Sequence, residues 1–143
     1  QEAIRRKLSP IPSEIKGKRC LVIDDSIVRG TTAAQIIELM RQSGAKEVIM
    51  ASTCPQIQFP CYYGSDFPSQ DELVAYNCTD EEVATKLGAD RVVFQTIQGL
   101  RKALNKDTLC TGCLTGSYPT DIACGSDFQS QRLKDRTTLI RKS

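Results

Sequence analysis

Two adjacent carboxylates, followed by a glycine and several hydroxyls, form the part of this sequence best suited to chemistry. Asp24 and Asp25 come directly after the apolar residues 21–23. The polar or small residues that follow them are Ser26, Gly30, Thr31 and Thr32. Carboxylates can bind sugar hydroxyls or a hard cation, whereas loop N–H groups and a helix N-terminus favour an anion. Residues 24–32 therefore predict a site for a sugar and a phosphate.

A plainer interpretation is that the acid pair marks a turn and that Thr31 or Thr32 caps the next helix. Against it, Ile27 and Val28 are β-branched residues beside charges in a loop, where core packing gives them no evident role. Strand, acids, loop and helix also agree in order and length, which favours the phosphate site. The role of Arg29 stays open, because it can pair with a phosphate or with an acid elsewhere.

Seven cysteines and no histidine are the second unusual feature. The odd count and the lack of a signal-peptide pattern argue against a disulfide framework. Without histidine, Cys-His and Ser-His nucleophile pairs are excluded. Cys110 and Cys113 have the C-x-x-C spacing of metal ligands, which alone is a moderate signal.

The elements that position these groups alternate between strand and helix patterns. Apolar runs predict strands at residues 18–25, 46–52 and 91–94. Apolar residues at helical spacing predict helices at residues 31–43 and 97–104. We expect residues 21–23 to be buried on both faces of a parallel sheet, with the acids at its carboxyl edge, where ligands bind. This order predicts an α/β fold, mainly a parallel sheet flanked by helices.

Turn and cap signals fill the rest of the chain. Ser69 and Thr79 each begin a capping box, which predicts short helices from Gln70 and Asp80. Loops are expected at residues 1–18, 53–64 and 107–119.

Composition limits the function classes. A chain of 143 residues with a 40% hydrophobic share fits one domain, and no apolar run is long enough for a membrane span. The net charge of +2 hides basic ends, residues 1–19 and 129–143, around an acidic middle. These ends are short and lack aromatic residues, so we expect no nucleic-acid binding. The chain reads as a cytoplasmic fragment of a longer protein.

The string DDSIVRGTT at residues 24–32 closely resembles the ribose-phosphate motif of the type I phosphoribosyltransferases. More narrowly, the chain resembles the glutamine phosphoribosylpyrophosphate amidotransferase (amidophosphoribosyltransferase) family. The supporting strings are RRKL at 5–8, FPCYYG at 59–64, PSQDEL at 68–73 and CTGCLTGSYP at 110–119. The resemblance implies that residues 1–124 are the C-terminal portion of a partial type I phosphoribosyltransferase fold. Residues 125–143 are expected to be a disordered basic tail.

The resemblance implies a glycosyltransferase reaction in de novo purine (IMP) biosynthesis. The family forms 5-phosphoribosylamine from phosphoribosyl pyrophosphate and glutamine. Asp24 and Asp25 would engage the ribose and Mg²⁺, and Lys7 would contact pyrophosphate. The groups expected to hold the 5-phosphate are Ser26, Arg29, Gly30, Thr31 and Thr32. The glutaminase domain that supplies ammonia is missing from this chain, so we expect the fragment itself to be inactive. The resemblance also implies a homo-oligomeric parent, and it identifies no certain catalytic residue within the fragment.

Many members of this family also carry a [4Fe–4S] cluster. The resemblance places three of its ligands at Cys61, Cys110 and Cys113 and the fourth outside this chain. Zinc is the alternative metal, completed by Cys54, Cys78 or another residue. We interpret the remaining cysteines as buried or incidental thiols unless they bind zinc; these are Cys20, Cys54, Cys78 and Cys124.

Three alternative functions remain. The chain could belong to a regulator that senses phosphoribosyl pyrophosphate without turning it over, or to a nucleobase phosphoribosyltransferase. The latter should lack the pattern of Cys61 with Cys110 and Cys113. A third alternative is a structural domain that a bound metal stabilises.

Overall fold

The computed structural model describes residues 8–65, 67, 69–123 and 125. The predictions for Lys7, for Cys124 and for residues 126–143 of the basic tail lie outside the described residues.

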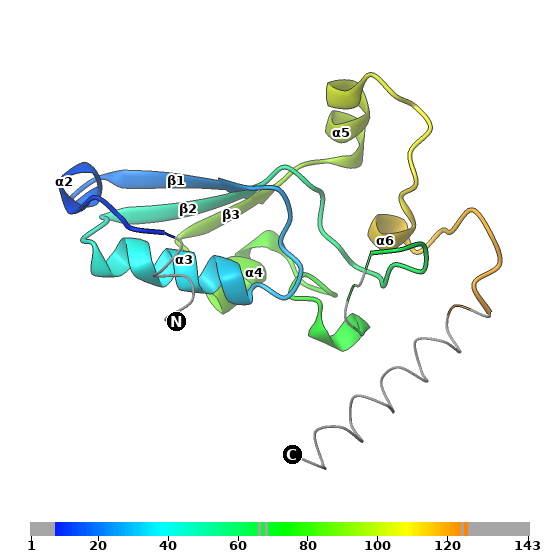
Figure 1. The fold of residues 1–143 in the computed structure, drawn as a ribbon, viewed down its shortest axis with the longest axis horizontal. Helices are drawn as coiled ribbons and strands as arrows, with labels where there is room; N and C mark the ends of the chain where they lie inside the picture. The colour runs from blue at the N-terminus through cyan, green and yellow to red at the C-terminus, as the bar shows by residue number, and fades with distance from the viewer. Residues whose placement is uncertain (1–7, 66, 68, 124, 126–143) are drawn as a thin grey trace, which may run out of the picture.

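Three parallel strands form the sheet, in the order β1-β2-β3 (Figure 1). The strands are β1 (Arg19–Asp24), β2 (Glu47–Ser52) and β3 (Arg91–Phe94). Each lies within one residue of its predicted position. In the register, Asp24 pairs with Ser52, and Ser52 pairs with Phe94. The carboxyl ends of all three strands therefore meet at one edge of the sheet, as predicted.

Two helices cover one face of this sheet, α3 (Thr31–Gln42) and α4 (Asp80–Leu87) (Figure 1). Apolar residues at helical spacing point toward the sheet, as the sequence predicts. The residues that are completely or almost completely buried between them include Ile37, Val48, Met50 and Val83. Burial of each such side chain stabilises the fold by about 1.5–3 kcal/mol. The predicted capping box of α4 is present, because Thr79 accepts from the Glu82 N–H while Glu82 accepts from the Thr79 N–H.

The opposite face of the sheet corrects one expectation. The side chains of Leu21 and Ile23 are 60% and 65% exposed, and Val93 is 40% exposed. The prediction that residues 21–23 are buried on both faces is therefore wrong within the described residues. The strand alternates instead, because α3 and α4 both lie on the same side of the sheet (Figure 1).

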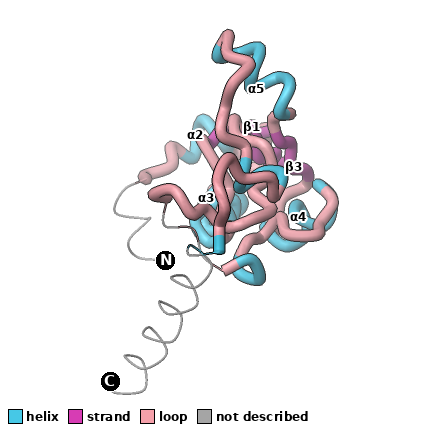
Figure 2. Tube along the Cα trace, turned by 90° about the vertical axis from the view of Figure 1, so that its right-hand side faces the viewer, coloured by secondary structure: helices cyan, strands magenta, loops and turns pink. Residues whose placement is uncertain are grey.

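Helix α5 (Ile97–Leu104) has its predicted bounds but an unexpected position. It stands apart from the sheet and its two covering helices (Figure 2). None of its residues is buried, and Leu104 is 53% exposed. Its apolar stripe, like the outer face of the sheet, makes no contribution to the core of the described residues.

Short helices occupy two segments predicted as loops, α2 (Pro12–Ile15) and α6 (Gly112–Thr115). The short helix predicted from Gln70 is the 3-10 turn η1 (Gln70–Glu72). The capping box predicted at Ser69 is absent, because the Ser69 hydroxyl donates to the Glu72 carboxylate and no side chain caps the turn. The predicted helix there is a single 3-10 turn.

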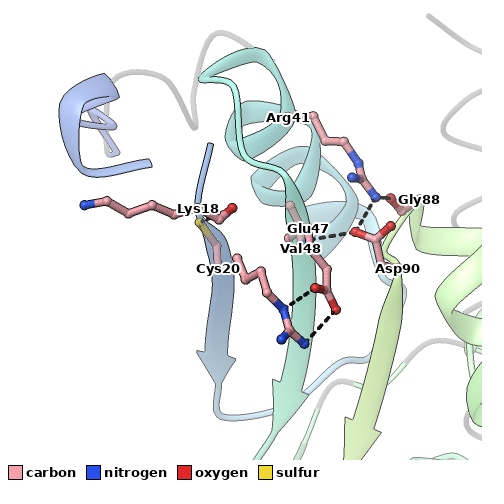
Figure 3. A network of polar contacts seen from close by, with 8 residues as sticks. Lys18, Cys20, Arg41, Glu47, Val48, Gly88 and Asp90 are labelled. Atoms are coloured by element: carbon pink, nitrogen blue, oxygen red, sulfur yellow. Dashed lines mark hydrogen bonds and ion pairs between the residues drawn. The ribbon is translucent and has the colours of Figure 1, made fainter. Parts of the chain in front are cut away.

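Polar contacts fasten the amino end of the sheet (Figure 3). The Asp90 carboxylate accepts from the Val48 N–H at 2.7 Å and from the Arg41 guanidinium at 2.9 Å. Arg19 of β1 pairs with Glu47 of β2. The Val48 and Arg41 contacts lower the pKa of Asp90, so it stays ionised at neutral pH. In the described part of the chain, no helix is long and apolar enough to cross a membrane.

Candidate functional site

A cavity of about 210 Å³ opens where β1 ends and α3 begins. It is lined by Asp24 and by residues 26–33. The predicted sugar-phosphate residues are thus brought together, with Asp25 outside the lining. The cavity lies at the carboxyl edge of the sheet, where parallel α/β folds bind ligands.

The two acids are held by short local contacts. The Asp24 carboxylate accepts from the Asp25 N–H at 2.9 Å, and the Asp25 carboxylate accepts from the Ser26 hydroxyl at 3.2 Å. Thr53, which follows β2, donates its N–H to the Asp24 carbonyl at 3.0 Å and its hydroxyl to the Asp25 carbonyl at 3.2 Å. The end of the neighbouring strand therefore fixes the backbone of both acids and leaves carboxylate oxygens for a ligand.

The loop presents a series of unused N–H groups. Within the described residues, the N–H groups of residues 26–30 donate to no other group. Gly30 is the N-cap of α3 with a φ of +75°, a left-handed conformation that favours glycine. No side chain caps this helix, so Thr31 and Thr32 do not serve as its cap. Free loop amides beside a helix N-terminus are the arrangement that binds an anion.

Ile27 corrects the argument made from the sequence. Its side chain is only 3% exposed and packs in the main hydrophobic core. The expectation that core packing gives Ile27 no role is wrong, because the loop folds back over the buried face of the sheet. The phosphate interpretation therefore rests on the cavity and the free N–H groups, while Ile27 anchors the loop.

Arg29 forms an ion pair within the protein. Its Nε donates to the Glu72 carboxylate at 3.3 Å, and both side chains are exposed to a similar extent. Partial burial alone would raise the pKa of Glu72, but hydrogen bonds from Arg29 and Ser69 lower it on balance. Arg29 nevertheless also lines the cavity. The sequence does not predict that Glu72 and Thr53 contact the loop, because each lies far along the chain and no local pattern marks it as a partner.

The segments at residues 54–63 and 110–118, called the cysteine segments below, lie side by side. The Cys113 carbonyl accepts from the N–H groups of Gln58 and Phe59 at 3.0 and 2.9 Å. The Tyr118 hydroxyl donates to the Pro60 carbonyl at 2.7 Å, and its ring meets that of Tyr62 edge to face at 5.0 Å. The fold thus brings the segment that carries Cys61 against the segment that carries Cys110 and Cys113.

The thiols within these segments differ in acidity. Burial, with the neighbouring thiols of Cys61 and Cys54, raises the pKa of Cys113 to about 11. Burial also acts to raise the pKa of Cys61, but hydrogen bonds, first from the Tyr63 N–H and then from Ser65, lower it on balance. Cys61 is therefore the more easily ionised of the two thiols.

The described part of the chain holds no group of three or more His, Cys, Asp or Glu side chains placed to bind a metal ion. This finding removes support for a preformed zinc site. Cys78 lies elsewhere, where its sulfur accepts from the Lys86 ammonium at 2.9 Å, so it does not complete such a site. A four-iron cluster makes a different demand, because each cysteine binds its own iron and the sulfurs lie farther apart than around a single ion.

Comparisons with known proteins agree with one another. Residues 2–83 match the family model described as the phosphoribosyl transferase domain. The amidophosphoribosyltransferase of Methanocaldococcus jannaschii is 47% identical over 84% of this chain. The amidophosphoribosyltransferase of Saccharomyces cerevisiae is 43% identical over 96% of it. The chain spans 26% and 27% of these two relatives, about a quarter of their length.

A solved structure is similar as well. The glutamine phosphoribosylpyrophosphate amidotransferase from B. subtilis, complexed with ADP and GMP, superposes with a TM-score of 0.73 at 35% identity. The match covers 85% of this chain and 29% of that one. A second structure, of the allosteric regulatory enzyme of purine biosynthesis, superposes with a TM-score of 0.72.

Proposed function

This chain belongs to the phosphoribosyl transferase domain family, and on that premise we propose that it is the phosphoribosyl pyrophosphate-binding part of an amidophosphoribosyltransferase. The observation that carries the proposal is the 24–32 loop. Its unused N–H groups and Asp24 surround a cavity at the carboxyl edge of the sheet, and Asp25 lies next to Asp24 just outside the lining. The relatives that match most of the chain carry that enzyme's name.

The proposed binding mode assigns each group a role. The N–H groups of residues 26–30, with the hydroxyls of Ser26, Thr31 and Thr32, hold the 5-phosphate, and the α3 dipole favours its charge. Asp24 and Asp25 bind the ribose hydroxyls. Displacement of pyrophosphate develops positive charge on the sugar ring, and two nearby carboxylates stabilise that charge.

The acid pair also fits a magnesium ion. Mg²⁺ is bound in phosphate-transfer sites by one or two carboxylates together with the substrate phosphates, so a third protein ligand is not required. When bound, the ion neutralises the departing pyrophosphate. Asp24 and Asp25 keep carboxylate oxygens free for it, because each accepts only one hydrogen bond within the described residues.

The proposed nucleophile is ammonia, released from glutamine by a glutaminase domain elsewhere in the protein. Neutral ammonia already carries a lone pair, so the site needs no strong base. The absence of histidine from the chain is consistent with this chemistry. The product would be 5-phosphoribosylamine, an intermediate of purine biosynthesis. The proposed parent protein is a cytoplasmic homo-oligomer that binds neither nucleic acid nor membrane. Lys7 remains a proposed contact to pyrophosphate.

The cysteine segments are the proposed location of a [4Fe–4S] cluster. Cys61, Cys110 and Cys113 would supply three thiolates and a residue outside this chain the fourth. The contact between the two segments supports this proposal, although the raised pKa of Cys113 requires that its proton leave before iron binds. The cluster is given no step in the reaction. Iron and sulfide near four per chain in anaerobically prepared parent protein would support it, and colourless protein would count against it.

The test of the reaction is pyrophosphate release from phosphoribosyl pyrophosphate by the protein that contains this chain. With ammonium chloride in place of glutamine, we expect turnover that Asp24→Asn and Asp25→Asn each reduce by at least about a hundredfold. Turnover with a nucleobase but not with ammonia would favour a nucleobase phosphoribosyltransferase. Binding without turnover would favour a regulator.

A further inference from the structure

Three consecutive residues of the 24–32 loop are held by a distant part of the chain. The Val28 carbonyl accepts from the Val74 N–H at 3.0 Å. Arg29 donates to the Glu72 carboxylate at 3.3 Å. A Cβ added to Gly30 would lie only 2.6 Å from Leu87 Cδ2, so the Gly30 backbone packs directly on that side chain.

These contacts determine how one peptide group of the loop is turned. The peptide between Val28 and Arg29 is trans, because the described chain contains no cis peptide bond. In a trans peptide the N–H points opposite to the carbonyl. Since the Val28 carbonyl is turned toward Val74, the Arg29 N–H is turned the other way. That N–H donates to no other group of the described residues, and Arg29 lines the cavity.

Two of the three holding residues, Val74 and Leu87, pack in or against the core, whereas Glu72 lies at the surface. Leu73 and Ala75, on either side of Val74, are 2% and 0% exposed. Leu87 is 4% exposed and belongs to the main core cluster. Glu72 is held in turn by the Ser69 hydroxyl at 3.2 Å. The loop is therefore tied to the core at Val28 and Gly30 and to the surface turn η1 at Arg29.

We propose that Glu72, Val74 and Leu87, called the brace below, are positioning residues that keep the Val28–Arg29 peptide N–H turned toward the bound phosphate. The proposal rests on the proposed function, in which the loop binds the 5-phosphate of phosphoribosyl pyrophosphate. Glu72 touches no substrate; it acts through Arg29.

Removing the charge of Glu72 changes phosphate binding in opposite directions, depending on whether Glu72 positions the loop or only repels the phosphate. A carboxylate beside an anion site repels the anion, so removing its charge should tighten phosphate binding. If Glu72 instead positions the loop, removing its charge weakens binding. Glu72→Gln therefore distinguishes the two, because it keeps the shape of the side chain.

The first experiment uses the parent protein with phosphoribosyl pyrophosphate and Mg²⁺. Glu72→Gln should raise the KM for phosphoribosyl pyrophosphate by about two- to fivefold, with kcat almost unchanged, the range expected from losing one exposed ion pair. Asp71→Asn is the matched control, because this substitution removes the same charge one residue away and the Asp71 side chain makes no hydrogen bond or ion pair in the described part of the chain. It should leave KM unchanged or lower it slightly. A KM for Glu72→Gln equal to or below that of the wild type would overturn the proposal.

The second experiment separates the brace from the proposed function. Backbone hydrogen exchange of the ligand-free parent protein reports whether the loop is held. Glu72→Gln should speed exchange at residues 26–30, whereas Asp71→Asn should not. Unchanged exchange in Glu72→Gln would overturn the brace even if phosphoribosyl pyrophosphate binds. Faster exchange without any binding of phosphoribosyl pyrophosphate to the wild type would uphold the brace and refute the proposed function.

Discussion

The 24–32 loop takes its groups from consecutive residues, whereas the cysteine segments meet from two stretches that lie far apart in the chain. In the loop, strand β1 delivers the acids and helix α3 begins where the N–H groups end. In the cysteine segments, the contacts run through backbone carbonyls, aromatic rings and a one-turn helix. The proposed anion site thus lies within one short stretch of the chain, whereas the cysteine segments, as far as the structure describes them, form a packed surface without a preformed metal-ligand set.

We expect the largest loss of stability from a substitution at Gly30, in the 24–32 loop. Gly30→Ala forces a Cβ into a left-handed backbone and to within 2.6 Å of Leu87, so we expect a loss of about 2–4 kcal/mol in unfolding free energy. Urea unfolding followed by circular dichroism measures it. Gly17→Ala is the control, because Gly17 has the same φ of +75° but nothing within 4 Å of an added Cβ. Equal losses for the two variants would mean that Gly30 is not closely packed.

The corresponding change in the cysteine segments is Gly112→Ala. An added Cβ would lie 2.5 Å from the Tyr118 ring at an ordinary backbone conformation, so overpacking should destabilise this region by about 1–3 kcal/mol. The chain has no Trp, so tyrosine fluorescence reports the change directly. In the double variant Gly112→Ala/Tyr118→Ala the first substitution should cost almost nothing further. Additive losses would show that the ring is not the obstacle.

Thiol reactivity sharpens the contrast within the cysteine segments. Because the pKa of Cys61 is lowered and that of Cys113 is raised to about 11, iodoacetamide at pH 8 should alkylate Cys61 roughly tenfold faster. Mass spectrometry of the digested protein measures both rates. Faster alkylation of Cys113 would contradict the burial and hydrogen bonding described for the two thiols.

The smallest effect concerns the Arg29–Glu72 pair. The pKa of Glu72 is lowered in the fold, so its contribution to stability is present above the ordinary value of 4.5 and is lost as the pH falls through the lower, folded value. For an exposed pair we expect at most about 1 kcal/mol. The difference in unfolding free energy between wild type and Glu72→Gln should shrink below pH 4.5. A difference that stays constant down to pH 2 would mean that the pair adds nothing.

The sequence predicts well wherever the information is local. The strands, the helices α3 and α5 and the capping box at Thr79 depend on periodicity and on neighbours within a few residues. The 24–32 loop is predictable for the same reason, since its acids and hydroxyls all lie within one short stretch of the sequence. Its conformation required a single glycine at the start of α3.

The sequence does not predict a contact when the two residues lie far apart in the chain. Nothing near Arg29 indicates that Glu72 would pair with it, and nothing near Ile27 indicates that the loop folds onto the core. The burial of Leu21 and Ile23 was wrongly predicted because an apolar run cannot tell which faces of a strand are covered. The role of the cysteines cannot be predicted from the C-x-x-C spacing of Cys110 and Cys113 alone, because that spacing is only a moderate signal of a metal site.

The most direct test of the central claim is hydrogen exchange of the parent protein with and without ribose 5-phosphate. The ligand carries the phosphate and sugar but no pyrophosphate, so it addresses the 24–32 loop alone. We predict slower exchange at residues 26–32 and no change at residues 54–63 and 110–118. Saturating ribose 5-phosphate that leaves exchange at residues 26–32 unaltered would contradict the assignment of this loop as the phosphate site.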